Sequence, residues 1–157
     1  MQLDFLSVQE LWLGIGCQSG VSSELIQLAI EKVLQEFKII PSAIIGIATI
    51  DSKAQEAGLV EFCQLYNLPL KTFSAAILSS VDVPNPANVV NKSVKTPSVA
   101  EAAAILATSQ LTARGKLLVP KQILRFPCEN KSLTVAIAKS AILINSPEKI
   151  INYTGNN

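Results

Sequence analysis

Residues 11–37 read LWLGIGCQSGVSSELIQLAIEKVLQEF and predict a strand, a glycine loop and a helix in succession. The apolar run from Leu11 to Ile15 is typical of a buried strand. Three glycines within residues 14–20 mark a turn, because glycine adopts backbone angles that other residues disfavour. Apolar residues then recur at helical spacing from Ser22 to Phe37. This succession is typical of an α/β fold.

The alternation of strands and helices continues along the rest of the chain. Further strands are predicted over 43–50, 70–73, 116–126 and 133–138. Further helices are predicted over 52–66, for a short stretch after Ser74, and over 98–109. Ser52 and Gln55 have the spacing of a capping box at the start of the helix over 52–66. Residues 81–97 hold three prolines and predict an irregular stretch, whereas residues 129–131 are expected to turn the last two strands into a hairpin.

These elements predict a single α/β domain over residues 1–157, with its core over 11–139 and a frayed tail over 152–157. Parallel strand–helix units closed by an antiparallel pair give a mixed sheet. We expect about five strands with helices packed on the sheet.

The composition suits a globular protein, with 49% hydrophobic and 16% charged residues. The net charge of +1 gives no general attraction for nucleic acid or for an anionic membrane, so neither is expected as a partner. The three cysteines are too widely spaced for a disulfide framework or a metal knuckle. We expect a cytoplasmic protein with free thiols.

The chain contains no histidine, which limits the chemistry that it can perform. Ser–His and Cys–His catalytic pairs are excluded, together with the commonest ligand of transition metals. An enzyme built from this sequence must use carboxylates, Lys, Tyr, Ser, Cys or backbone amides. No metal site is predicted.

The first candidate site is the glycine loop, with Gly14, Gly16, Cys17 and Gly20. A loop between a strand and a helix presents backbone N–H groups and the positive end of the helix dipole to an anion. The spacing lacks the third glycine of a dinucleotide fingerprint and the lysine of a P-loop. Composition alone therefore favours a plain turn, and a cysteine without a base partner favours burial over reactivity.

The second candidate follows the next strand, where Asp51, Lys53 and Glu56 stand close together. Ligands of open α/β sheets gather at the carboxyl ends of the strands. Lys53 suits an anionic group, and Glu56 suits the orientation of that group or a proton transfer. The alternative is an ordinary i,i+3 pair on a helix surface, which the spacing by itself favours.

The third candidate is the start of the alanine-rich helix, where Ser98 and Glu101 have the spacing of a capping box. Helix initiation explains both residues. The helix start is still a second place suited to an anion, beside Lys92 and Lys95 of the irregular stretch. We expect the three candidate segments to converge on one cleft at one edge of the sheet.

An ordered set of short segments identifies the chain as similar to a known family. The segments are 12–17 (WLGIGC) with Gly20, 47–53 (IATIDSK), 56–59 (EAGL), 68–70 (LPL), 73–75 (FSA), 97–104 (PSVAEAAA) and 133–138 (LTVAIA). In this order they resemble the C-terminal domain of the cobalamin biosynthesis protein CbiG and the related single-domain CobE proteins. The chain departs from the family where it has Gln18 in place of a basic residue and Lys95 in place of a glycine.

The resemblance implies a role in vitamin B12 synthesis, on a corrin-ring intermediate such as cobalt-precorrin-5A. Proteins of the CbiG type open the ring-A lactone of that intermediate and release the extruded carbon as acetaldehyde. The substrate is ringed with carboxylates and already carries cobalt, so the resemblance implies no separate cofactor. It fits Lys53, Lys92 and Lys95 as carboxylate contacts, and other CbiG regions or pathway enzymes as partners.

Three interpretations remain open at this point. The chain is a binding domain for a corrin intermediate that acts with a partner, a self-sufficient lactone hydrolase that activates water with Glu56 or Glu101, or a plain interaction module or scaffold in which the glycine loop and the caps are only structural. Absorbance titration with a cobalt corrinoid separates the last interpretation from the others. Measurement of acetaldehyde release separates the second from the first.

Overall fold

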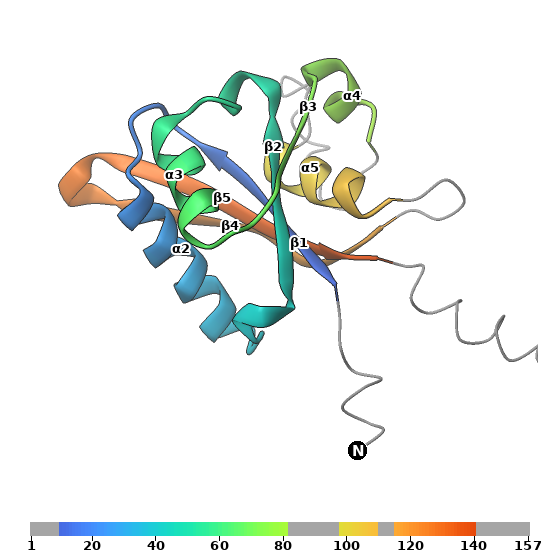
Figure 1. Cartoon of the computed structure of the whole chain (residues 1–157), viewed down its shortest axis with the longest axis horizontal. Coiled ribbons are helices and arrows are strands. Elements are labelled where there is room, and N and C mark those ends of the chain that lie inside the picture. Colours follow the sequence, from blue (N-terminus) through green and yellow to red (C-terminus); the bar gives the residue numbers. More distant parts are fainter. Residues whose placement is uncertain (1–9, 82–97, 110–114, 141–157) are drawn as a thin grey trace, which may run out of the picture.

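The computed structural model describes residues 10–81, 98–109 and 115–140 (Figure 1). Its strands are β1 (Leu11–Cys17), β2 (Ile44–Ile50), β3 (Leu70–Phe73), β4 (Lys116–Phe126) and β5 (Lys131–Lys139). Its α-helices are α2 (Ser23–Glu36), α3 (Ala57–Leu65), α4 (Ala75–Ser79) and α5 (Val99–Thr108). Short 3-10 turns cover Pro41–Ala43, Asp51–Lys53 and Pro127–Glu129.

The five strands form one mixed sheet in the order β3-β2-β1-β5-β4. β1, β2 and β3 run parallel, whereas β5 is antiparallel to both of its neighbours. The β4–β5 hairpin turns at Asn130, whose φ of 57° lies in the left-handed region that asparagine tolerates better than most residues. The predicted mixed α/β sheet of five strands is confirmed.

Helices cover both faces of this sheet (Figure 1). Leu11, Leu13 and Ile15 of β1 pack into a core beneath α2 and α3. Trp12, on the opposite face, packs into a second core with the alanines of α5. The split follows from the alternation of side chains along a strand. We call these two surfaces the α2 face and the α5 face.

Local sequence explains the helices that were predicted well. In α2, buried apolar residues recur along one side, and the Ser22 hydroxyl accepts a hydrogen bond of 3.1 Å from the Leu25 N–H. Ser74 caps α4 in the same way, with 3.2 Å to the Ile77 N–H. Each cap satisfies a backbone donor that has no partner within the helix.

No helix in the described part of the chain is long and apolar enough to cross a membrane.

The start of α3 differs from its prediction. The pattern at Ser52 and Gln55 suggested a capping box, but residues 51–53 form a 3-10 turn and α3 begins at Ala57. Glu56 is the N-terminal cap residue in an extended conformation, and its side chain makes no capping bond. The physical reason is a contact with a distant part of the chain, because the Glu56 carboxylate bonds to Gly20 instead.

Candidate functional site

The first part of the candidate site is the turn that follows β1. Residues 14–20 were expected to form one glycine loop, but β1 continues to Cys17 and the turn begins at Gln18. The expectation is wrong for Gly14 and Gly16, which are strand residues on the α5 face. Gly20 does need a flexible backbone, since its φ is +85°. The turn and the start of α2 therefore lie at the carboxyl end of β1.

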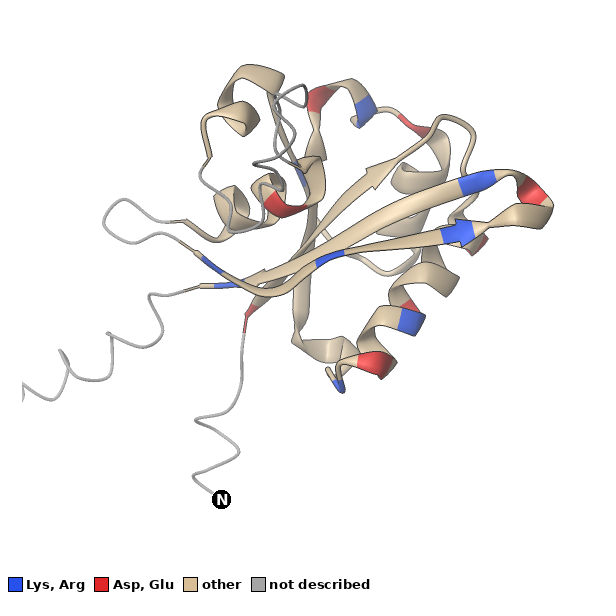
Figure 2. Cartoon of the chain, turned by 180° about the vertical axis from the view of Figure 1, so that it is seen from behind, with Lys and Arg blue, Asp and Glu red and all other residues tan. Residues whose placement is uncertain are grey.

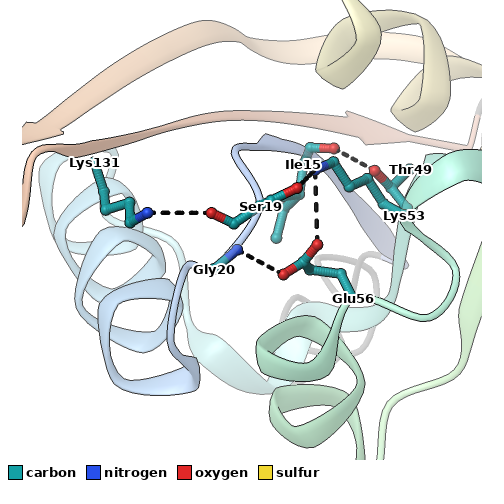
Figure 3. Close-up of polar contacts among 7 residues, drawn as sticks. All are labelled: Ile15, Ser19, Gly20, Thr49, Lys53, Glu56 and Lys131. Atoms are coloured by element: carbon teal, nitrogen blue, oxygen red, sulfur yellow. Dashed lines mark hydrogen bonds and ion pairs between the residues drawn. The ribbon is translucent and has the colours of Figure 1, made fainter.

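The second part follows β2, and the Glu56 carboxylate ties it to the first. Glu56 Oε2 accepts a hydrogen bond of 2.8 Å from the Gly20 N–H (Figure 3). Glu56 Oε1 lies 3.7 Å from Lys53 Nζ. These two residues do not share a helix, as the sequence had suggested, because Lys53 lies in the 3-10 turn. Asp51 begins this turn and is exposed.

Two lysines from distant segments converge on Ser19. Lys53 Nζ donates to the Ser19 hydroxyl at 3.3 Å, and Lys131 Nζ donates to the Ser19 carbonyl oxygen at 3.2 Å (Figure 3). Lys131 opens β5, 112 positions away in the chain, so no local pattern predicted its role. We call Ser19, Gly20, Lys53, Glu56 and Lys131 the edge site.

Two further polar contacts fix the end of β1, and sequence reasoning missed both. Thr49 Oγ1, which is buried, donates to the Ile15 carbonyl oxygen at 2.6 Å (Figure 3). Gln18 Oε1 accepts from the Ser132 N–H at 3.0 Å, which joins the turn to β5. A hydroxyl inside an otherwise apolar strand is the signal that could have revealed Thr49, because buried polar groups need partners.

The edge site lies where the order of the strands reverses. Helices α2 and α3 follow β1 and β2 on the same face, and the chain then passes to the α5 face before it reaches β4. This reversal puts β5 beside β1, with the start of β5 next to the carboxyl end of β1. In open α/β sheets ligands bind at such a point, outside the carboxyl ends of the strands.

The start of α5 lies at the same end of β1. A Cβ atom at Gly16 would be 3.9 Å from the Val99 Cβ atom, in the first turn of α5. The Ser98 hydroxyl accepts from the Glu101 N–H at 3.3 Å, so the predicted cap by Ser98 is confirmed. The structure thus brings the glycine segment, the Lys53 segment and the Ser98 segment together. Lys92 and Lys95 lie outside the described residues.

The Glu101 side chain does not complete the capping box that the sequence suggested. Glu101 Oε2 instead accepts a hydrogen bond of 2.9 Å from the Lys121 N–H of β4. The residue is fully buried, and its Oε1 atom has no hydrogen-bond partner among the described residues. The register of β4 shifts between Val119 and Gln122, which frees the Lys121 N–H from the strand ladder. The Glu101 side chain therefore accepts a hydrogen bond from the irregular part of β4 rather than from the start of its own helix.

The Cys17 thiol is a poor nucleophile in this environment. Burial raises the pKa of Cys17 above its usual value, Lys53 lowers it by less, and Glu56 adds a further increase. Because the thiolate is the reactive form, a raised pKa keeps Cys17 protonated at neutral pH. This agrees with the interpretation of Cys17 as a partly buried structural residue.

Replacement of Ser98 with alanine should lower the free energy of unfolding by about 1 kcal/mol. The substitution leaves the Glu101 N–H at the start of α5 without its acceptor. Urea denaturation of the two proteins measures the difference. Ser98→Thr keeps the hydroxyl and should retain most of the stability. Equal loss in the alanine and threonine variants would contradict the cap.

The arrangement of charges suits an anion better than a metal ion. Among the described residues, no three Cys, Asp or Glu side chains lie close enough together to hold a metal ion. A cavity of about 470 Å³ between α2 and α3 is lined mainly by apolar side chains, and no candidate residue lines it. The edge site offers two ammonium groups from separate segments at the end of β1. Such a pair suits carboxylate groups of a ligand.

Comparisons with known proteins point to one pathway. The chain is 32% identical over 96 residues to the cobalt-precorrin-5A hydrolase of Priestia megaterium. That stretch is 61% of this chain but 26% of the relative, so the chain spans about a quarter of the hydrolase. It is therefore related to a protein that is much longer than the part they share.

Solved structures from the same pathway share the fold. CobE, from the cobalamin biosynthetic pathway, superposes with a TM-score of 0.69 and 28% identity, over 83% of this chain and 93% of its own. The cobalamin biosynthesis protein chiG of Agrobacterium tumefaciens gives 0.61 and 28%, over 83% and 98%. A cobalamin biosynthesis protein G homologue from Sulfolobus solfataricus gives 0.62 over 83% and 37%; at 21% identity it shows the fold alone.

A family model described as the C-terminus of cobalamin synthesis protein G matches residues 11–138. The match runs from the first residue of β1 to the last residue but one of β5 and includes all five strands. It includes the edge site and the start of α5. The chain therefore belongs to the family of the C-terminal domain of cobalamin synthesis protein G, and it is a cobalamin biosynthesis protein related to cobalt-precorrin-5A hydrolase.

Proposed function

We propose that this chain binds a corrin-ring intermediate such as cobalt-precorrin-5A and contributes to hydrolysis of its ring-A lactone. The observation that carries the proposal is the convergence of Lys53 and Lys131 on Ser19 where the strand order reverses. A corrin intermediate is ringed with carboxylates, and paired ammonium groups at this edge match them in charge. Cobalt belongs to the substrate, so the proposal needs no cofactor held by the protein.

Hydrolysis requires a group that takes a proton from water, and the two candidate carboxylates differ in this respect. Both oxygens of Glu56 are engaged, one by the Gly20 N–H and the other by Lys53. Glu101 has an oxygen without a partner among the described residues, although it is fully buried. Glu101 is therefore the better candidate for the general base once a bound substrate or partner gives water access to it.

The proposed step is balanced with water as the sole co-reactant. The water oxygen adds to the lactone carbonyl carbon while its proton passes to Glu101. The bond from that carbon to the ring oxygen then breaks, and the departing oxygen takes the proton back. The products of this step are a carboxylic acid and a hydroxyl group on the extruded carbon. In a second step the hydroxyl loses its proton and the bond from the extruded carbon to the macrocycle breaks, which releases acetaldehyde, while the macrocycle keeps the electron pair and takes up a proton.

A carrier role without catalysis is the second candidate function. The observation that favours it is that the matched stretch makes up only 26% of the hydrolase from Priestia megaterium. In that case the remaining parts of a hydrolase, in the same or another chain, perform the chemistry on a corrinoid that this domain holds. Acetaldehyde release from cobalt-precorrin-5A is measured with the purified chain alone and with the remaining parts of a hydrolase. Release that depends on Glu101 supports the catalytic contribution, and release that does not depend on it supports the carrier role.

Lys53→Ala should weaken the binding of a cobalt corrinoid that carries free carboxylates by about tenfold, which is one lost charge-assisted contact. The loss should shrink as salt is raised, because counterions screen the attraction. Absorbance titration of the corrinoid at two salt concentrations measures both effects. The free energy of unfolding should change by less than about 1 kcal/mol, because the Lys53–Glu56 pair is 3.7 Å apart and both side chains keep some contact with solvent, at 18% and 16% exposed.

Lys32→Ala is the matched control for this experiment. Lys32 is an exposed lysine near the far end of α2, away from the turn at Ser19. Its loss removes the same charge but should leave the corrinoid affinity unchanged. Equal weakening of corrinoid binding in both variants would mean that the loss comes from the change in net charge. Lys53 would then not be part of the binding site.

A further inference from the structure

Gly16 stands apart from the other described glycines because the fold gives no reason for it. A Cβ atom at Gly14, Gly46, Gly58 or Gly115 would collide with a neighbouring group, and Gly20 has a φ of +85°. A Cβ atom at Gly16 would make only ordinary contacts, at 3.8 Å to Thr134 and 3.9 Å to Val99. A strand glycine without a packing reason can mark a place where a ligand approaches the backbone closely.

Gly16 lies in a row of the sheet that α5 leaves partly uncovered. Gly16 pairs with Thr134, and Thr134 pairs with Ile123, so the row crosses β1, β5 and β4. Gly14 lies under the α5 backbone, and residue 16 therefore faces the same side. Ile123 is 50% exposed although it is a large apolar residue, whereas Gly16 and Thr134 are partly exposed.

The next row outward adds a charge to this surface. Arg125 pairs with Ser132, and Arg125 is exposed. Leu124 and Phe126 pack against the core of the α2 face, so Ile123 and Arg125 face the α5 side. We call Gly16, Ile123, Arg125, Ser132 and Thr134 the Gly16 surface.

The shape and charge of this surface restrict what can bind to it. Three strands at a spacing of about 4.8 Å make an area about 10 Å wide, on which the face of a macrocycle can lie. The neighbouring hairpin is basic, and Figure 2 shows Lys and Arg positions along both of its strands. Of these, Arg125 lies on the side of Gly16, whereas Lys131 and Lys139 lie on the side of Leu133 and Ile137, toward the α2 face; neither strand contains Asp or Glu. A flat ligand with carboxylates around its rim is complementary to such a surface.

We propose that a corrinoid ring lies against the Gly16 surface, with its rim carboxylates toward Arg125. The absent side chain of Gly16 lets the ring approach the backbone of β1, while Ile123 and Thr134 contact its apolar face. This inference rests on the proposed function and specifies where on the domain the ring is held.

Gly16→Leu tests the surface because it adds bulk above the sheet at a position where the added Cβ atom makes only ordinary contacts. Two probes are titrated by absorbance, cobyrinic acid with free carboxylates and cobinamide with amides in their place. Gly16→Leu should weaken the binding of both probes by at least tenfold, since the leucine side chain blocks the ring itself. Arg125→Ala should weaken the binding of cobyrinic acid by about fivefold and leave the binding of cobinamide unchanged.

Gln35→Leu, at an exposed position of α2, is the control for added apolar bulk and should bind both probes like the unmodified chain. Thermal unfolding of Gly16→Leu should match that of the unmodified chain. If Gly16→Leu is folded and binds both probes unchanged, the Gly16 surface is wrong while the proposed function stands. If the unmodified chain binds neither probe, the proposed function fails, and this inference fails with it.

Discussion

Gly14→Ala should lower the free energy of unfolding by about 3 kcal/mol, at the upper end of the usual cost of overpacking a core. The new Cβ atom would overlap the Ala100 carbonyl oxygen and would lie 2.9 Å from the Ala100 carbonyl carbon and 3.0 Å from the Ala104 nitrogen. All three are backbone atoms of α5, so no side chain can rotate to make room. The helix would have to move away from the sheet, with loss of the contacts between its alanines and Trp12.

The chain contains its own reporter for this experiment. Trp12 is the single tryptophan, it is 8% exposed, and it packs in the same core as α5. Urea denaturation followed by tryptophan fluorescence therefore measures both stability and the docking of α5. An unchanged unfolding midpoint in Gly14→Ala would mean that α5 is not held against β1 as described.

Gly16→Ala is the matched control, two residues along the same strand and on the same face. Because its Cβ atom would make only ordinary contacts, we expect the stability to be equal or higher by about 0.5 kcal/mol. The two glycines are indistinguishable in the sequence, yet their expected effects differ by several kcal/mol. A similar loss in both variants would show that strand glycines matter here for a reason other than contact with α5.

Local patterns predicted the elements of the fold well. The helix expected from Ser22 to Phe37 is observed as α2, from Ser23 to Glu36, because its apolar periodicity and its cap are both local features. The short helix after Ser74 and the hairpin through Asn130 were also predicted correctly for local reasons. In these elements the structure favoured by the local sequence is the structure observed in the fold.

The errors arose where distant residues determine the local structure. Glycines at 14 and 16 suggested a turn, whereas they lie in a strand beneath an alanine-rich helix that follows more than 80 residues later. The start of α3 was placed too early because the sequence does not reveal the bond from Glu56 to Gly20. Lys131 was missed for the same reason, since its contact with Ser19 joins segments that share no local pattern.

Glu101→Ala should lower the free energy of unfolding by about 2 kcal/mol, because it leaves the partly buried Lys121 N–H without its acceptor and opens space beside α5. Glu101→Gln should cost less, about 1 kcal/mol, since its amide oxygen can still accept from Lys121 while its amide nitrogen takes the unpartnered place of Oε1. Urea denaturation measures both changes, and the difference between them gives the combined contribution of the contact with β4 and of the filled space beside α5.

Amide hydrogen exchange at Lys121 localises the effect and separates structure from catalysis. Exchange at this amide should accelerate in Glu101→Ala and remain slow in Glu101→Gln, because only the glutamine keeps the acceptor. Slow exchange in the alanine variant would contradict the bond. In an assembly that opens the lactone, Glu101→Gln keeps the fold but cannot take a proton, so a loss of acetaldehyde release in this variant would assign the base to Glu101. Undiminished release would leave Glu101 with a structural role, as the carboxylate that joins α5 to the irregular part of β4.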